Sequence, residues 1–185
     1  RHDRQPGVLT VTPSELSRIM PHARGVDCAT YAPLLTAAAL EFDITSAARQ
    51  AAWLAQLAHE SGELHYVEEL ASGEAYEGRK DLGNVYPGDG VTFKGRGLIQ
   101  LTGRANYKLL SDAFQVDLLK HPELLEQPVY AARSAAWFWK THGLNELADQ
   151  GDFVRITRRI NGGVNGLAQR SVYWRVAKAV LGVEG

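Results

Sequence analysis

Hydrophobic residues recur at spacings of three and four along most of the chain, in segments separated by proline, glycine or short polar turns. That period indicates helices that bury one face. The pattern predicts helices over residues 13–20, 28–42, 46–61, 104–114, 128–141, 152–160 and 167–181. Three boundaries carry their own signals, because Thr12 precedes a proline, Ser46 can cap the third helix, and Gly62 follows its last turn. The chain is therefore expected to be mainly α.

The region 71–97 departs from this pattern, because it contains seven glycines. Long, glycine-rich segments inside a compact domain are usually functional or irregular. Short strands or turns are expected around Thr92–Lys94 and Leu98–Thr102, where apolar and polar residues alternate. We predict one helical domain over 1–185, wrapped around a cleft built from loops, with residues 1–7 as a flexible tail.

Composition limits the possible functions. Twenty basic and 21 acidic residues give a formal net charge of −1, which argues against a protein that wraps nucleic acid. Cys28 is the only cysteine, so a disulfide framework and a cysteine-rich zinc site are excluded. No apolar run has membrane-spanning length, and residues 1–7 lack the apolar core of a signal peptide. We expect no metal, no nucleic-acid partner and no stable membrane insertion.

Glu60 is the first candidate for chemistry. It lies at the end of the third predicted helix, three residues after Leu57 and seven after Trp53, on or beside the apolar face. Partial burial and the negative end of the helix dipole both disfavour a carboxylate there. The position therefore suits a general acid, which must hold its proton. The alternative is that Glu60 pairs with a nearby arginine.

A second set of candidates follows the helix. Glu68 and Glu69 lie beyond Gly62, where one of the two can face a cleft while the other faces water. Further on, Gln100 and Thr102 share one face if that segment is extended. Thr102 is also a candidate cap for the helix over 104–114. Two carboxylates in different environments are what glycoside hydrolysis requires.

Four motifs, in order, resemble glycoside hydrolase family 19. They are Ala58-His-Glu-Ser-Gly62, Val67-Glu-Glu-Leu70, Phe93-Lys-Gly-Arg-Gly-Leu-Ile-Gln-Leu-Thr102 and Arg159-Ile-Asn-Gly-Gly163. The resemblance covers roughly residues 45–181. Within the family, the bacteriophage endolysin branch, which cleaves peptidoglycan, is more similar than the plant-type chitinases.

The resemblance implies a lysozyme-like helical fold with a small β element beside the active-site cleft, and an inverting mechanism without a metal or organic cofactor. Glu60 corresponds to the general acid. Glu69 corresponds best to the second carboxylate, with Glu68 as the alternative, and Thr102 to the hydroxyl that holds the attacking water. Gln100 and Asn161 are similar to substrate-binding positions of the family, and Arg170 to its late arginine. Apart from the resemblance, Tyr107 is an aromatic residue near the motifs that could stack on a sugar ring, and Glu68 is a further candidate for substrate binding.

Three positions depart from the chitinase branch. Leu98 stands where that branch usually has proline, Gly103 where it often has an aromatic residue, and Glu63 where a second glycine is usual. We therefore predict a monomeric endolysin of the N-acetylmuramidase type that hydrolyses β-1,4 bonds of peptidoglycan and lyses bacteria. It would have no separate wall-binding domain, would be made in the host cytoplasm without a signal peptide, and would act on the wall after release.

Three alternatives remain at this point: a chitinase, a catalytically inactive wall-binding module, and a lytic transglycosylase, which typically uses one essential glutamate.

Overall fold

The computed structural model describes residues 9–184, so the predicted tail over 1–7 lies outside the described residues. Its helices are α1 (Pro13–Ile19), α2 (Gly25–Glu41), α3 (Ala47–Glu60), α4 (Asp89–Thr92), α5 (Arg104–Phe114), α6 (Pro128–Thr141), α7 (Leu144–Asp149), α8 (Phe153–Asn161) and α9 (Leu167–Leu181). Short 3-10 turns are η1 (Glu74–Tyr76), η2 (Lys80–Leu82) and η3 (Pro122–Glu126). The prediction of a mainly helical fold is confirmed.

Local sequence explains most of the helix boundaries. Thr12 caps α1 in a reciprocal capping box with Glu15, Ser46 caps α3, and Asp152 caps α8. Helix α2 begins three residues earlier than predicted, at Gly25, because no capping side chain marks its start. Helix α7 was not predicted, since a helix of six residues gives too short a periodic signal.

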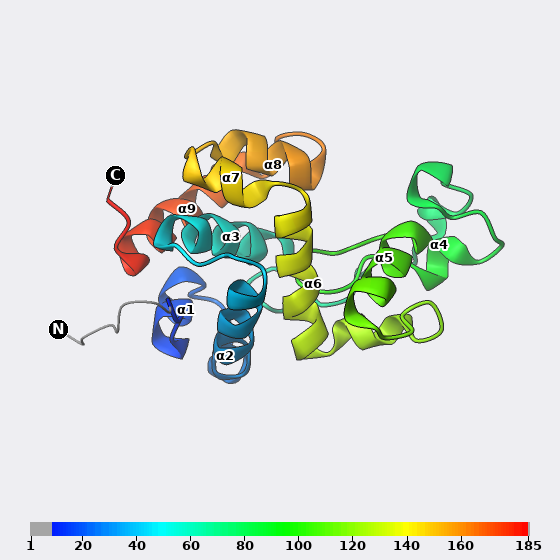
Figure 1. Cartoon of the computed structure of the whole chain (residues 1–185), viewed down its shortest axis with the longest axis horizontal. Coiled ribbons are helices and arrows are strands. Elements are labelled where there is room, and N and C mark those ends of the chain that lie inside the picture. The colour runs from blue at the N-terminus through cyan, green and yellow to red at the C-terminus, as the bar shows by residue number, and fades with distance from the viewer. Residues whose placement is uncertain (1–8, 185) are drawn as a thin grey trace.

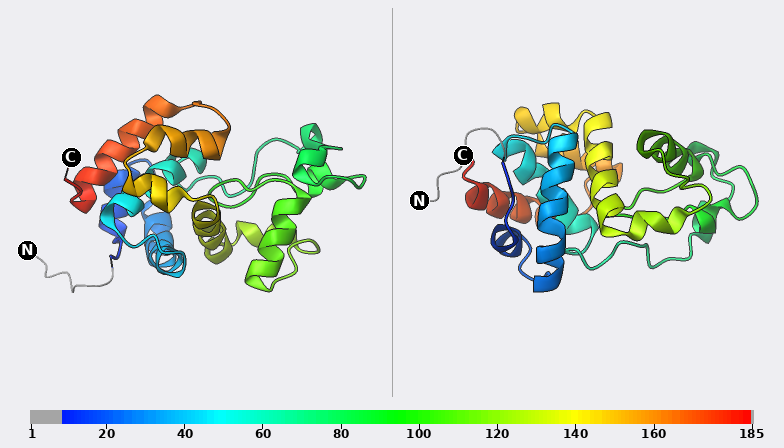
Figure 2. Two further views of the ribbon diagram at one scale, coloured as in Figure 1. Left: turned by 45° about the horizontal axis from the view of Figure 1, so that its top comes forward. Right: turned by 60° about the horizontal axis from the view of Figure 1, so that its bottom comes forward.

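The helices form a larger and a smaller group (Figure 1). In the larger group, α3 packs most extensively against α9 and also touches α7 and α1, while α6 packs against α2. The smaller group contains α4 and α5 with the turns η1 and η2, and irregular segments join it to the rest (Figure 2). Helix α3 ends at Glu60, so the predicted acid lies at the end of this helix, before the chain continues towards the smaller group.

The core of the larger group forms around α3. Trp53 and Leu57 on this helix are at most 1% exposed, and Trp139 on α6 is fully buried. Burying side chains of this size stabilises a fold by about 1.5–3 kcal/mol each. The predicted apolar stripe of α3 is confirmed, and it fixes the helix that carries Glu60. Within residues 9–184, no helix combines the length and the hydropathy needed to cross a bilayer.

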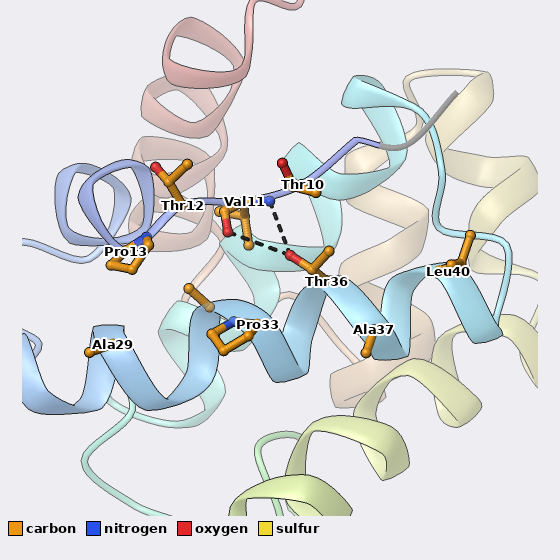
Figure 3. Close-up of a pocket in the computed structure, with 10 residues that line it drawn as sticks. Thr10, Val11, Thr12, Pro13, Ala29, Pro33, Thr36, Ala37 and Leu40 are labelled. Carbon is orange, nitrogen blue, oxygen red and sulfur yellow. Dashed lines mark hydrogen bonds between the residues drawn. The ribbon is translucent and has the colours of Figure 1, made fainter. Parts of the chain in front are cut away.

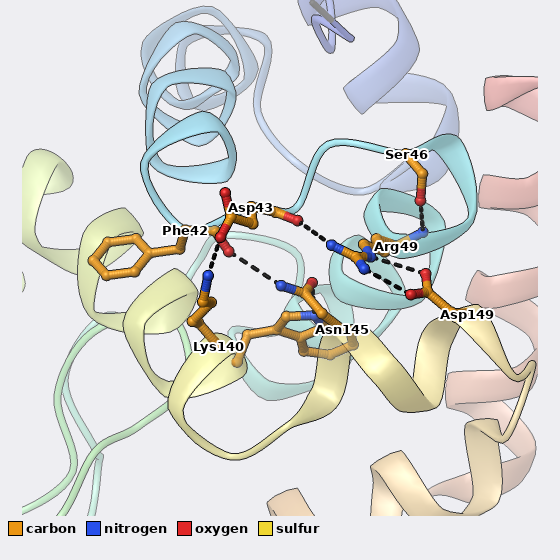
Figure 4. Close-up of polar contacts among 8 residues, drawn as sticks. Phe42, Asp43, Ser46, Arg49, Lys140, Asn145 and Asp149 are labelled. Atoms are coloured by element: carbon orange, nitrogen blue, oxygen red, sulfur yellow. Dashed lines mark hydrogen bonds and ion pairs between the residues drawn. The ribbon is translucent and has the colours of Figure 1, made fainter.

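Polar contacts fix the start of α3 (Figure 4). Arg49 donates two hydrogen bonds to the carboxylate of Asp149 on α7, at 2.8 and 2.6 Å. Asn145, also on α7, donates to the carbonyl of Phe42 before α3 and accepts from the indole nitrogen of Trp139. Since these contacts tie the α2–α3 turn to α6 and α7, they set the direction in which the far end of α3 points.

The expected β element is smaller than predicted. Among the described residues, pairing consists of isolated antiparallel bridges from Arg96 to Glu68 and to Leu101. Thr92 belongs to the short helix α4 rather than to a strand. Gly97 and Gln100 have φ values of 82° and 58°, and left-handed backbone of this kind interrupts an extended strand.

Candidate functional site

Glu60 is the last residue of α3, and its side chain is 19% exposed. Its Oε1 lies 2.7 Å from Nη1 of Arg170 on α9, whose side chain is 1% exposed. The same guanidinium donates to Oε1 of Gln56 at 2.6 Å and to the carbonyl of Asn165 at 3.0 Å. Direct substrate binding by Arg170 is therefore wrong for this structure, because its guanidinium is buried against protein groups. Arg170 contacts Glu60 instead.

A buried network holds Arg170 in place. Gln56 accepts from the guanidinium and donates through its amide to Oγ1 of Thr157, at 3.0 Å. Thr157 in turn donates to the carbonyl of Phe153, one turn earlier on α8. Buried polar groups that are all hydrogen-bonded keep a fixed geometry. Gln56 was not predicted as part of the site, although it is a polar residue one turn before Glu60 on the same face of α3.

The pairing alternative for Glu60 is present in the structure. Nη1 of Arg170 lies 2.7 Å from Oε1 of Glu60, so the end of α3 is joined to α9 by an ion pair.

Glu69 is held by two donors in the smaller group. The hydroxyl of Tyr76 donates to Oε1 at 2.8 Å, and the backbone N–H of Gly95 donates to Oε2 at 3.0 Å. The backbone of Glu69 also donates to the carbonyl of Gly95. Both oxygens of this carboxylate therefore have fixed positions, because each accepts a hydrogen bond. Tyr76 lies outside the four motifs, and its contact with Glu69 was not predicted from the sequence.

Three polar side chains converge at Gly95. A Cβ atom at this position would lie 3.1 Å from Oε2 of Glu69, 3.2 Å from Oε1 of Gln100 and 3.3 Å from Oγ1 of Thr102. Gln100 is oriented by its amide nitrogen, which donates to the carbonyl of Gly97 at 2.8 Å. A carboxylate, an amide and a hydroxyl oxygen therefore all lie within 3.3 Å of one point beside Gly95.

Thr102 does not cap α5. The N-cap of this helix is Gly103, and the Thr102 hydroxyl donates to the carbonyl of Gln100 at 3.1 Å. The capping alternative is wrong because the backbone at Gly103, with φ of 97°, separates Thr102 from the helix start. The hydroxyl is thereby kept beside Glu69.

Glu68 has a different environment from its neighbour. Its carboxylate is 42% exposed and lies 2.6 Å from Nζ of Lys94. The hydrogen bond from Lys94 lowers the pKa of Glu68 below its ordinary value. Lys94 also donates to the backbone carbonyl of Glu69. The two adjacent carboxylates therefore have different partners: Glu68 pairs with Lys94, and Glu69 accepts a hydrogen bond from Gly95.

Tyr107 is fully buried in the smaller group. Its hydroxyl donates to the carbonyl of Lys94 at 2.6 Å and accepts from Arg96 at 3.0 Å, and its ring packs 5.1 Å from that of Phe93. Burial raises the pKa of Tyr107 well above its ordinary value. The prediction that Tyr107 binds substrate is wrong for this structure, since a sugar cannot reach a ring in this position.

Asn161 is exposed at the end of α8. Gly162 follows it with φ of 80° and donates to the carbonyl of Arg158, which is a helix C-cap. The motif that contains Asn161 therefore forms the C-terminal cap of α8. A substrate-binding role for Asn161 remains a prediction.

An apolar groove lies elsewhere in the molecule (Figure 3). It has a volume of about 550 Å³ and runs between residues 10–13 and α2. None of the predicted site residues lines it. In the described part of the chain, no group of three or more His, Cys, Asp or Glu side chains is placed to hold a metal ion.

Comparison with known proteins identifies relatives of this chain. Residues 33–150 match the model of glycoside hydrolase family 19, described as chitinase class I. A Haemophilus influenzae protein described as containing a glycosyl hydrolase family 19 domain is 36% identical over 108 residues, 58% of this chain and 52% of the relative. An Arabidopsis thaliana endochitinase is 39% identical over 147 residues, 76% of this chain and 50% of the relative. The chain thus spans about half the length of the curated relatives it matches.

Solved structures show the same fold over nearly the whole chain. Chitinase C from Streptomyces griseus has a TM-score of 0.79 at 23% identity, covering 97% of this chain and 96% of that one. A bacterial family 19 chitinase has a TM-score of 0.77 at 26% identity, covering 95% and 97%. The helical fold, the ordered motifs and the family match lead to one conclusion: the chain belongs to glycoside hydrolase family 19.

Proposed function

We propose that the chain hydrolyses β-1,4 glycosidic bonds of a polymer of N-acetylated amino sugars, with Glu60 as general acid and Glu69 as general base. The observation that carries this proposal is the convergence of Glu69, Gln100 and Thr102 at Gly95. A carboxylate accepts a proton from water, and a neighbouring hydroxyl and amide orient that water for attack.

Each carboxylate has a partner suited to its role. As Glu60 gives its proton to the glycosidic oxygen, a negative charge forms on its carboxylate, and Arg170 at 2.7 Å stabilises that charge. Glu69 is held by Tyr76 and Gly95, so its oxygens stay in position while water loses a proton. The proposed reaction is inverting, in line with the family resemblance, because water rather than a carboxylate attacks the anomeric carbon.

For the substrate, we propose peptidoglycan, with the chain acting as a monomeric N-acetylmuramidase-type endolysin that reaches the wall after release. Support comes from the departures near the site. A Cβ at Gly103 would lie 2.6 Å from the carbonyl of Leu82, so an aromatic side chain does not fit after Thr102. The half-buried Leu82 of η2 also brings its own Cβ to within 2.7 Å of that position.

Chitin is the second candidate, and the names of the relatives favour it. The Arabidopsis thaliana relative is an endochitinase, and the Streptomyces griseus structure is a chitinase. Leu98, another departure from the chitinase branch, is fully buried and therefore does not contact a substrate.

Product analysis separates these functions. Purified peptidoglycan and a soluble chitin oligosaccharide are digested in parallel and analysed by mass spectrometry, with Glu60→Gln as the inactive control. Hydrated glycan fragments ending in N-acetylmuramic acid support the muramidase proposal, and cleavage of the chitin oligomer alone supports the chitinase. An anhydro product would instead identify a lytic transglycosylase, and binding without any product would identify an inactive binding module.

A further inference from the structure

The turn after Glu60 has an unusual backbone. Gly62, Glu63 and Leu64 are consecutive residues with φ values of 55°, 55° and 69°. Glycine accepts this conformation without a steric penalty. Glu63 and Leu64 do not, because a Cβ atom in left-handed backbone approaches the following carbonyl oxygen. Such strain persists only where surrounding contacts hold it, and it is concentrated at functional sites.

The carboxylate of Glu63 supplies these contacts. Glu63 is 4% exposed, and its Oε1 accepts a hydrogen bond from the hydroxyl of Tyr173 at 2.6 Å. Nδ1 of His22 lies 3.1 Å from the same oxygen, and the backbone N–H of His22 donates to Oε2. Burial by itself raises the pKa of Glu63, but the hydrogen bonds from Tyr173 and His22 outweigh it and bring the pKa below its ordinary value. The group is therefore an ionised, buried and fully partnered carboxylate at neutral pH.

The partners come from two distant parts of the chain. His22 lies in the connection between α1 and α2, and Tyr173 lies on α9. Tyr173 follows Arg170 by three residues, which places the two on one face of the helix. Helix α9 thus holds Glu60 through Arg170 and Glu63 through Tyr173.

Backbone contacts transmit this restraint to the turn itself. The N–H of Glu63 donates to the carbonyl of Ala58 at 2.8 Å, and the N–H of Leu64 donates to Oγ of Ser61 at 2.9 Å. The N–H of Tyr66 donates to the carbonyl of Ser61 at 2.9 Å. The turn therefore closes back on the last turn of α3, where Glu60 is located.

We propose that Glu63 is a positioning residue: its carboxylate, bound by Tyr173 and His22, holds the left-handed turn and thereby fixes Glu60 against Arg170 and the start of the segment that leads to Glu69. This inference rests on the proposed function, because it explains how the two proposed catalytic carboxylates, Glu60 and Glu69, are held in position. The substitution of Glu63 for a second glycine then has a reason, since a glycine offers the backbone freedom but no carboxylate for Tyr173 and His22.

The test compares Glu63→Gln and Tyr173→Phe with Glu41→Gln. The control removes a carboxylate of the same size from a surface pair with Arg133, outside the turn and the site. Two quantities are measured on the whole chain: amide hydrogen exchange of Glu63 and Tyr66, and kcat and KM on whichever polymer the wild type cleaves. Tyr173→Phe removes one hydroxyl and no charge, so it keeps the test decisive if Glu63→Gln fails to fold.

We expect both variants to exchange faster at the turn than the wild type, with exchange in α6 unchanged. We expect kcat to fall about 10- to 100-fold, as small displacements of a catalytic group do, with KM within about twofold. The control should match the wild type. A kcat within twofold of wild type overturns the proposal, and so does a fall in kcat while the turn stays protected. If the wild type cleaves neither polymer, the proposed function fails, whereas exchange at the turn still supports or overturns the restraint by Glu63.

Discussion

Replacing Gly95 by alanine tests the convergence of side chains on which the proposed base depends. Gly95 does not have a positive φ, so its backbone accepts alanine without conformational strain. The added methyl group would lie 3.1 to 3.3 Å from oxygens of Glu69, Gln100 and Thr102. Ordinary contacts begin near 3.4 Å, so each neighbour must move by a few tenths of an ångström.

Two effects of this methyl group differ in size. Crowding should lower the free energy of unfolding by about 1–3 kcal/mol, which is the usual range for an extra methyl group in a packed site. The effect on turnover should exceed what this crowding alone would cause, because the methyl group would occupy the point that lies close to all three oxygens. We expect kcat to fall at least about 100-fold, which corresponds to about 2.7 kcal/mol of activation free energy.

The matched control is Gly25→Ala. No atom lies within 4 Å of a Cβ at Gly25, and its φ is not positive. At the start of α2 this change should alter the free energy of unfolding by no more than about 1 kcal/mol and leave kcat unchanged. Both variants are assayed by thermal unfolding and by release of reducing ends. If Gly95→Ala keeps more than half of the wild-type kcat, the three oxygens do not form the site of the attacking water.

Four further outcomes are expected. Glu60→Gln should remove general acid catalysis and lower turnover by about 10²–10⁴-fold with unchanged melting, whereas retention of half the activity would exclude Glu60 as the acid. Glu69→Gln should reduce kcat more than Glu68→Gln, and the reverse order would move the base by one residue. The first product from a β-linked oligosaccharide should be the α anomer by proton NMR, and an initial β anomer would contradict attack by water. Finally, because the folded pKa of Glu63 lies below its unfolded value near 4.5, this carboxylate stabilises the fold above that pH and the stabilisation is lost as the pH falls through the folded pKa. Acid unfolding of Glu63→Gln should therefore show a weaker pH dependence there, and an unchanged slope would contradict it.

Helices with strong local signals could be predicted closely from the sequence. The observed α5, α6 and α9 begin and end at the predicted residues, since proline, glycine or a polar turn bounds each of them. Irregular backbone could not be predicted in the same way. The alternation of Ile99, Gln100 and Leu101 favoured a strand, but a left-handed residue at Gln100 turns the chain there. A two-residue period does not reveal such a turn, because it reports only which side chains are apolar.

The candidate site shows the same contrast between what local sequence predicts and what only the folded structure shows. Glu60, Glu69 and Thr102 could be selected because each belongs to a short local motif, and the structure brings Glu69 and Thr102 together at Gly95. The burial of Tyr107 could not be predicted, since a helical period identifies an apolar face but not the residues that cover it. An aromatic residue near a motif is therefore weak support for a sugar contact until its exposure is known.

The pairing of polar side chains that lie far apart in the sequence is the part of the site that could not be predicted, and it determines what Glu60 contacts. Arg170 lies 114 residues after Gln56, yet one buried guanidinium bonds both Gln56 and Glu60. The carboxylate at the end of α3 therefore has its cationic partner on α9, 2.7 Å away. In the proposed mechanism, Glu60 acquires a negative charge when it gives up its proton, and the guanidinium of Arg170 already lies beside it. The packing of α3 against α9 therefore creates, in the folded protein, a place already suited to the carboxylate that proton transfer leaves behind.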